Sequence, residues 1–116
     1  MTPAEFEDVV AGALQELPAD LASKVENVAV VVAVRPTRDQ ASDGVVLGLY
    51  EGVSLADRGV DYFGYMPDRI TIFMEPHLAM GLSDTELRAE IRTTVLHEMA
   101  HHFGISDDRL DEIGWD

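Results

Sequence analysis

Residues 83–107, which read SDTELRAEIRTTVLHEMAHHFGISD, decide the fold because they predict one long helix with both ends marked. Ser83 and Glu86 form a capping box, in which each side chain accepts a hydrogen bond from the other residue's backbone N–H. No Pro or Gly interrupts residues 87–103, and apolar side chains lie nearly all round, which is typical of a helix packed on several sides. Gly104 is a natural cap after the last turn because Gly tolerates a positive φ.

Two histidines on this helix have the spacing of metal ligands. His97 and His101 are four residues apart, so their side chains share one face with about 6 Å between the Cβ atoms, and both can bind one ion. Glu98 lies about 100° further round the helix, near enough to take a proton from a water bound to that ion. The pattern HExxH therefore indicates a catalytic zinc site, which needs a third protein ligand.

Asp107 is the preferred third ligand. Gly104 can turn the chain back sharply, and a carboxylate three residues later has the reach to lie beneath the same ion. The alternatives are Asp108, Asp111 and Glu112. Glu112 follows His101 by only eleven residues, which leaves little chain for the second helix that such a glutamate ligand uses. The expected zinc site holds one ion between His97, His101 and Asp107.

The rest of the chain predicts one small α+β domain over residues 1–116. A capping box at Thr2 and Glu5 begins an amphipathic helix, which Pro18 ends, and one or two further turns follow in residues 20–26. Strands are expected at residues 28–34, 45–53 and 69–74, the last closed by Pro76. Residues 37–44 read as a loop, and residues 54–66 show no clear period.

A resemblance to a known family rests on these residues. The stretch HEMAHHFGISD at residues 97–107 matches the pattern HExxHxxGxxD of Asp-zincins, and residues 69–115 as a whole resemble the minimal zincin-like metallopeptidases of bacteria. The resemblance implies a zincin-like fold, with a small mixed sheet packed against the motif helix. It also implies that Glu98 is the general base and that the zinc ligands are His97, His101 and Asp107.

The chain departs from this family pattern in two ways. Larger relatives carry a methionine turn beneath the metal, but no Met follows Asp107 here. Trp115 is the candidate to pack beneath the metal in its place; the alternative is that Trp115 packs at the edge of the core. No Tyr or His follows Asp107 to stabilise an oxyanion. The tyrosines elsewhere that could do so are Tyr50, Tyr62 and Tyr65.

Three other polar residues have competing interpretations. His102 points about 100° away from His101, which favours a packed histidine over a ligand. His77, next to Pro76, is expected in a loop and in contact with solvent. Glu90 precedes His97 by two helical turns, which is compatible with lining the cleft, although the favoured interpretation is a residue on a solvated face.

Composition limits the classes of partner. The chain has 22 acidic and 8 basic side chains and a formal net charge of −14, which disfavours nucleic acid and anionic membranes. It has no Cys, whereas small secreted domains often depend on disulfides, so this absence favours the cytoplasm. The longest apolar run, residues 28–34, is far too short to span a bilayer. Residues 1–16 lack the basic and apolar regions of a signal peptide, so a cytoplasmic protein is expected.

The functional hypothesis is a zinc-dependent metallopeptidase in which Glu98 activates a zinc-bound water. The strand at residues 69–74 would bind an extended substrate if it formed the sheet edge beside the cleft. So small a domain has little material for a second cleft wall. We therefore expect that the substrates are short or unfolded peptides, or that a partner chain, such as the second copy of a homodimer, supplies the missing wall. The alternatives are a zinc-binding structural or partner-binding module with little or no turnover, and a structural protein without metal.

Overall fold

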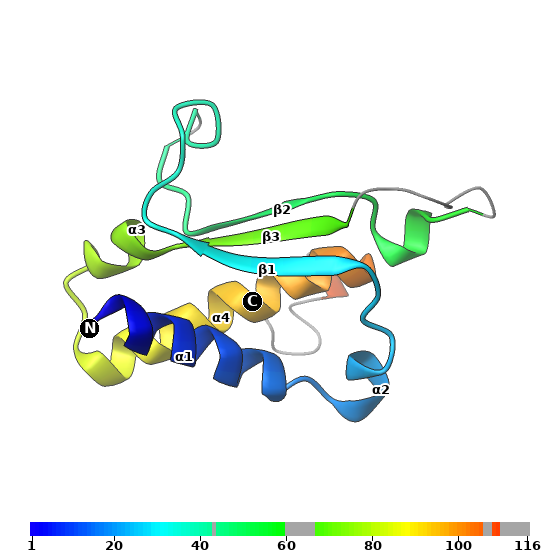
Figure 1. Cartoon of the computed structure of the whole chain (residues 1–116), viewed down its shortest axis with the longest axis horizontal. Helices are drawn as coiled ribbons and strands as arrows, with labels where there is room; N and C mark the ends of the chain where they lie inside the picture. The colour runs from blue at the N-terminus through cyan, green and yellow to red at the C-terminus, as the bar shows by residue number, and fades with distance from the viewer. Residues whose placement is uncertain (43, 60–66, 106–107, 110–116) are drawn as a thin grey trace.

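The computed structural model describes residues 1–42, 44–59, 67–105 and 108–109 (Figure 1). The helices of this part of the chain are α1 (Pro3–Gln15), α2 (Ala19–Ala22), α3 (Met74–Leu78) and α4 (Asp84–Phe103), with a short 3-10 turn η1 (Leu55–Asp57). The strands are β1 (Val28–Ala33), β2 (Gly48–Glu51) and β3 (Asp68–Phe73). The order of helices and strands confirms the expected α+β fold.

The three strands form one small mixed sheet in the order β1-β3-β2. The central strand β3 pairs in parallel with β1, where Val30 lies opposite Ile70, and antiparallel with β2, where Tyr50 lies opposite Ile70 on its other side. The idea that residues 69–74 form the sheet edge was therefore wrong. Ile70 and Ile72 are fully buried. The central position allows β3 to bury these apolar side chains, and β2 lies at one edge of the sheet.

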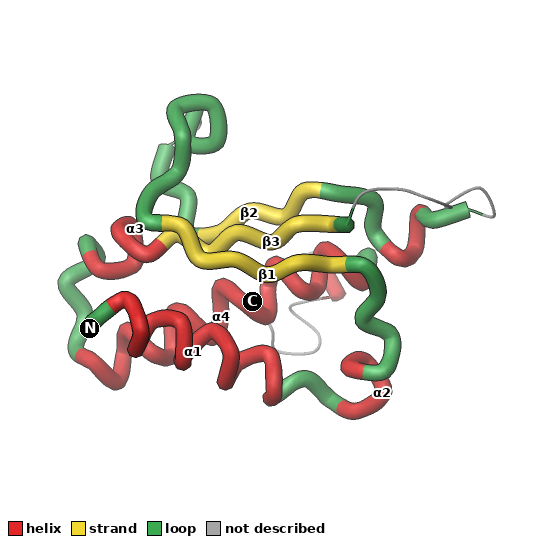
Figure 2. The backbone as a smooth tube through the Cα atoms, viewed as in Figure 1, coloured by secondary structure: helices red, strands yellow, loops and turns green. Residues whose placement is uncertain are grey.

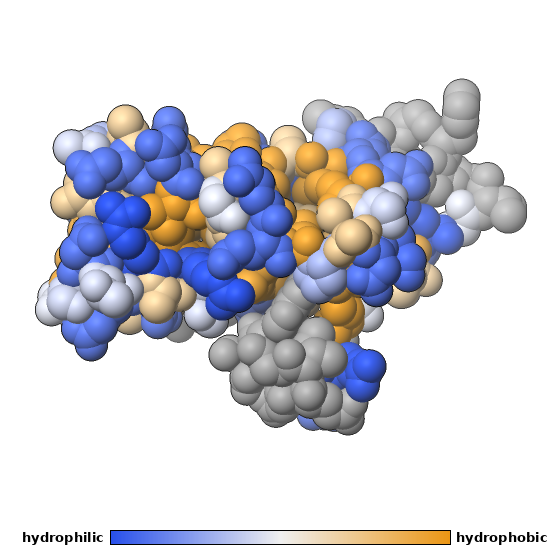
Figure 3. Space-filling model, turned by 90° about the horizontal axis from the view of Figure 1, so that it is seen from below, coloured by the Kyte–Doolittle hydropathy of each residue, from blue (hydrophilic) through white to orange (hydrophobic). Residues whose placement is uncertain are grey.

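Helices α1 and α4 lie next to each other and cover one face of the sheet (Figures 1 and 2). The core between the two layers combines apolar side chains from each: Phe6, Val10, Ile70, Ile72, Ile91, Val95 and Met99. Burial of one such side chain contributes about 1.5–3 kcal/mol. Seen from the helix side, hydrophilic residues cover much of the surface, and apolar residues show between them (Figure 3).

Helix α4 begins and ends where its sequence predicts. The capping box at Ser83 and Glu86 is formed in both directions, and Gly104 follows the last turn with a left-handed φ of 81°. A Cβ at position 104 would collide with η1, because it would lie 2.5 Å from the Ala56 Cβ. Gly at this position thus ends the helix and lets η1 pack against its end.

The structure corrects the prediction for residues 74–78. The third strand ends at Phe73 and Met74–Leu78 forms α3, in which Pro76 lies in the first turn, where a missing N–H is tolerated. His77 is therefore not a solvated loop residue. Its side chain is fully buried, with Nδ1 2.7 Å from the Phe73 carbonyl oxygen and Nε2 2.9 Å from Thr94 Oγ1. Two hydrogen bonds compensate the loss of water.

Two further elements are shorter than expected. The turn after α1 is limited to Ala19–Ala22, and β2 covers only the middle of the predicted strand at residues 45–53. Gly48 and Gly52 bound this strand, and Gly is unfavourable inside strands because it has no side chain to pack. Within the described residues, no helix has the length and apolar character that a bilayer crossing requires.

Candidate metal centre

The two motif histidines of α4 converge on one point in space. Nε2 of His97 lies 3.2 Å from Nε2 of His101, and the two rings are nearly perpendicular, with centroids 4.9 Å apart. Two nitrogens bound to one tetrahedral zinc at about 2.0–2.1 Å lie roughly 3.3–3.4 Å from each other. The spacing of the two rings therefore fits a shared ion without rearrangement of the helix.

Glu98 lies beside this pair. A carboxylate oxygen of Glu98 and one ring nitrogen of each histidine are all within 4.8 Å of one another. The Glu98 residue is only 9% exposed. Burial raises the pKa of this carboxyl above its usual value, although the charges of His101 and His97 act in the opposite direction. A raised pKa suits a carboxylate that must accept a proton near neutral pH.

The predicted third ligand, Asp107, lies outside the described residues, as do Asp111, Glu112 and Trp115. Its assignment stays a prediction. Asp108, the remaining alternative, is described and exposed to solvent.

A cleft of about 370 Å³ runs along α4 and is lined by His97 and Glu98 of the motif. One wall is the segment that leads into β2, residues 45–48, and the other is α4, which contributes Glu90, Thr93, Thr94, His97 and Glu98. Of the two interpretations of Glu90, the cleft-lining one agrees with this geometry. A Cβ on Gly48 would lie 2.8 Å from Thr94 Cγ2 and 3.2 Å from Glu98 Cγ, so the absence of a side chain lets β2 run close to the motif helix.

A second hollow, of about 450 Å³, adjoins this cleft and shares Val45 and Val46 with it. Its lining also includes Pro76, Ala79 and Met80 from the region of α3. Val45 is 87% exposed and Met80 is 41% exposed. Exposed apolar side chains gathered at one place mark binding surfaces more often than isolated ones do.

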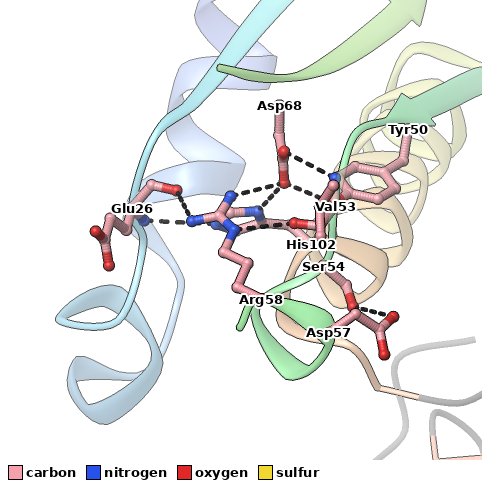
Figure 4. Close-up of polar contacts among 8 residues, drawn as sticks. All are labelled: Glu26, Tyr50, Val53, Ser54, Asp57, Arg58, Asp68 and His102. Carbon is pink, nitrogen blue, oxygen red and sulfur yellow. Dashed lines mark hydrogen bonds and ion pairs between the residues drawn. The ribbon is translucent and has the colours of Figure 1, made fainter. Parts of the chain in front are cut away.

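A buried aspartate organises the end of the molecule where α4 finishes (Figure 4). Asp68, at the start of β3, is 1% exposed and accepts hydrogen bonds from the Tyr50 hydroxyl, from Arg58 Nη2 at 3.0 Å and from the Val53 N–H at 3.1 Å. His102 Nδ1 lies 2.9 Å from the same carboxylate. Burial raises the pKa of Asp68, but the hydrogen bonds from Tyr50, His102 and Val53, with the charge of Arg58, outweigh it and hold the pKa below its usual value.

His102 is a packed residue, as its position on the helix favoured. Its side chain is fully buried, and the Glu26 N–H approaches its Nε2 at 3.5 Å. A neutral ring with the proton on Nδ1 satisfies both contacts, because it donates to Asp68 and accepts from Glu26.

Sequence reasoning missed Asp68 and Arg58. Asp68 is a charged residue directly before an apolar strand, which is a weak signal for a buried carboxylate. Arg58 lies in a stretch without period. For Tyr50, considered above as an oxyanion donor, the hydroxyl is directed to Asp68 and the residue is absent from the lining of the cleft. Tyr62 and Tyr65 lie outside the described residues.

Comparisons with known proteins agree with this geometry. A family model described as zincin-like metallopeptidase matches residues 25–115. A solved structure of a conserved hypothetical protein from T. thermophilus is similar at a TM-score of 0.58 and 24% identity, over 99% of this chain and 100% of that one. At this identity the similarity supports the fold alone. A comparison with curated proteins found no match. The family model spans most of the sequence, including the whole of α4, and the chain therefore belongs to the zincin-like metallopeptidase family.

Proposed function

We propose that this chain is a zinc-dependent peptidase with one ion held by His97, His101 and Asp107. The observation that carries the proposal is the 3.2 Å approach of the two Nε2 atoms. Two unprotonated imidazole nitrogens repel each other at this distance unless a proton or a cation lies between them. Membership of a metallopeptidase family supports a cation there.

The donor set fits zinc better than a hard cation. Imidazole nitrogen is a preferred zinc ligand, whereas magnesium and calcium favour sites made of oxygen atoms. When bound, zinc would polarise a carbonyl group and lower the pKa of water towards about 7.

Glu98 is the general base of the proposed reaction. It lies one residue after a ligand, within 4.8 Å of both ring nitrogens, and it lines the cleft in which a substrate would bind. Its carboxylate accepts a proton from the attacking water and then donates it to the leaving amine. The raised pKa of Glu98 makes both transfers easier, because the group can hold the proton between the two steps.

The substrate is proposed to be a short or unfolded peptide that lies along β2. This strand pairs with β3 on one side only within the described sheet, and the segment that leads into it forms one wall of the cleft. An extended peptide can bind to such an edge through its backbone and place alternate side chains in pockets. The adjoining apolar hollow at Val45, Val46 and Met80 would accept an apolar side chain.

Glu98→Gln separates a peptidase from a zinc-binding module without turnover. The variant keeps the size of the side chain and removes its basicity. A peptidase should bind zinc as the wild type does and lose hydrolysis of a peptide library by about 10²–10⁴-fold, the usual contribution of a general base. Hydrolysis by Glu98→Gln at the wild-type rate would refute the peptidase proposal.

The third ligand is tested by a matched pair of variants, Asp107→Ala and Asp108→Ala. Zinc affinity, measured by competition with a chelator, should fall in the first variant and stay unchanged in the second, whose exposed side chain is directly adjacent in the sequence. A loss confined to Asp108→Ala would move the ligand to that position. A loss in neither variant would exclude both.

A further inference from the structure

Among the residues that the structure describes, none makes with His101 the hydrogen bond that usually orients a metal-binding histidine. Such a ring normally donates its second N–H to a carboxylate or a carbonyl group, which fixes its orientation. Within the part of the chain that the structure describes, the polar contact of the His101 ring is the Nε2 approach to His97, and no hydrogen bond reaches its Nδ1. Among the described residues, the orientation of this ring therefore depends on contacts other than a hydrogen bond to Nδ1.

The ring of Tyr50 lies against His101. The two planes differ by only 15°, and their centroids are 6.3 Å apart, which is an offset stacked arrangement. The contact follows from the course of β2. Gly48 and Tyr50 are two residues apart, so they face the same side of the strand. Gly48 approaches Glu98, and Tyr50 approaches His101 one turn further along the motif helix.

Tyr50 is itself fixed at its far end by Asp68. Its hydroxyl donates to the buried carboxylate, which also accepts hydrogen bonds from Arg58 and Val53 and contacts His102 (Figure 4). Arg58 is in turn bound to backbone oxygens of Val53 and Glu26, at 2.9 Å and 3.1 Å. The tyrosine ring is thus held by a β-strand at one end and by a buried ionic cluster at the other.

We propose that Tyr50 is a positioning residue for the metal site, which holds the His101 ring in the ligating orientation because Asp68 holds Tyr50. The inference rests on the proposed zinc site and deepens it. In this arrangement an aromatic plane replaces the usual hydrogen bond to the second ring nitrogen. The ionic cluster around Asp68 affects zinc through Tyr50, without contact to the ion.

Zinc affinity of two Tyr50 variants tests the proposal. Tyr50→Phe keeps the ring and removes its anchor on Asp68, and Tyr50→Leu also removes the stacking plane. We expect zinc affinity to fall about tenfold or more in Tyr50→Leu, the loss usual when the support of a metal ligand is removed. The loss in Tyr50→Phe should be smaller. Chelator competition would be run where circular dichroism shows each metal-free protein to be folded.

A control variant separates positioning from loss of stability. Thr2→Ala removes the cap of α1, far from His101 in the sequence, and lowers stability by about 1 kcal/mol. It should leave zinc affinity unchanged. If Tyr50→Leu and Tyr50→Phe also bind zinc within about twofold of the wild type, the positioning role of Tyr50 is excluded. The proposed zinc site would stand in that case, because the wild type would still bind zinc.

A second measurement needs no metal. In the metal-free protein, NMR of the His101 ring should show one orientation in the wild type and averaging between orientations in Tyr50→Leu. The same ring signals in both proteins would overturn the positioning role whether or not the chain binds zinc. Since Tyr50→Phe is the milder change, it provides the same comparison if Tyr50→Leu does not fold.

Discussion

At the scale of single residues, two buried ionisable side chains lie close to the motif helix and respond to pH in separate ranges. His77 is fully buried between Phe73 and Thr94, and burial lowers its pKa below the ordinary value of 6.5 although the Phe73 carbonyl oxygen and the charge of Glu90 oppose the shift. Asp68 has a lowered pKa, with an ordinary value of 3.8. Both pKa values are lower in the folded state than in the unfolded chain. Each group therefore supports the folded state at pH values above its unfolded pKa, and this support is lost as the pH falls towards the folded pKa.

The metal-free protein should lose stability as the pH falls from 7.5 through 6.5 towards the lower pKa of folded His77. In this range the unfolded chain takes up a proton on His77 that the folded state excludes, so protonation favours unfolding. Denaturant unfolding at a series of pH values should show this loss in the wild type and a smaller loss in His77→Gln. Identical pH profiles for the two proteins would show that His77 does not titrate as proposed.

The contribution of Asp68 should disappear at lower pH. Because its folded pKa is depressed, its stabilising effect is fully present above about 3.8 and is lost as the pH falls through the folded pKa. Acid unfolding of wild type should therefore be steeper below pH 4 than that of Asp68→Asn. Equal slopes for the two proteins in that range would contradict the role assigned to the ionic cluster.

Gly48 and Gly12 form a matched pair for the close approach of β2 to the motif helix. Gly48→Ala places a Cβ against Thr94 and Glu98, and such overpacking costs about 1–3 kcal/mol. Gly12→Ala lies inside α1, where a Cβ meets nothing within 4 Å, and it should stabilise the protein by about 0.5–1 kcal/mol. Denaturant unfolding measures both changes. Stabilisation by Gly48→Ala would show that β2 does not pack so closely there.

At the scale of elements, the sequence predicts helices better than the sheet. The caps at Thr2, Ser83 and Gly104 are local, so residues 2–17 and 83–104 carry enough information to locate α1 and α4. The central position of β3 depends on which partner strands can bury Ile70 and Ile72. A local sequence pattern does not predict these partners. The same holds for His77, whose partner Thr94 is 17 residues away.

The site divides in the same way. The convergence of His97 and His101 follows from one helix and could be predicted from their spacing. The cluster around Asp68 could not, because its members come from β2, the residue after η1, β3 and the end of α4, and Asp68 and His102 alone are 34 residues apart. The residues that support this site come from segments that are distant in the sequence. The two histidine ligands lie close together because they are four residues apart on one helix.

Helix α4 depends on its first turn. Ser83→Ala removes the side chain that accepts the Glu86 N–H and should lower the free energy of unfolding by about 1 kcal/mol. The exposed neighbour Thr85 is the control, since Thr85→Ala removes no cap. Denaturant unfolding compares the two. An equal effect of both variants would mean that the capping box does not stabilise this helix.

At the scale of the whole molecule, the net charge of −14 acts against compactness, because many acidic groups share a body of only 45 × 32 × 27 Å. Salt shortens the Debye length from about 30 Å at 0.01 M to about 10 Å at 0.1 M. The melting temperature of the metal-free protein should rise over this range. A fall would mean that the exposed ion pairs, such as Arg92–Glu16 and Arg88–Asp84, outweigh the general repulsion.

The zinc content of the purified chain tests the central claim most directly. Wild type and His77→Gln should each carry one zinc ion per chain by elemental analysis after dialysis, because His77 is buried behind Thr94 and does not itself line the cleft. His97→Ala and His101→Ala should carry none. Zinc retained by His97→Ala at the wild-type level, or wild type without zinc under conditions that load other zinc enzymes, would contradict the account.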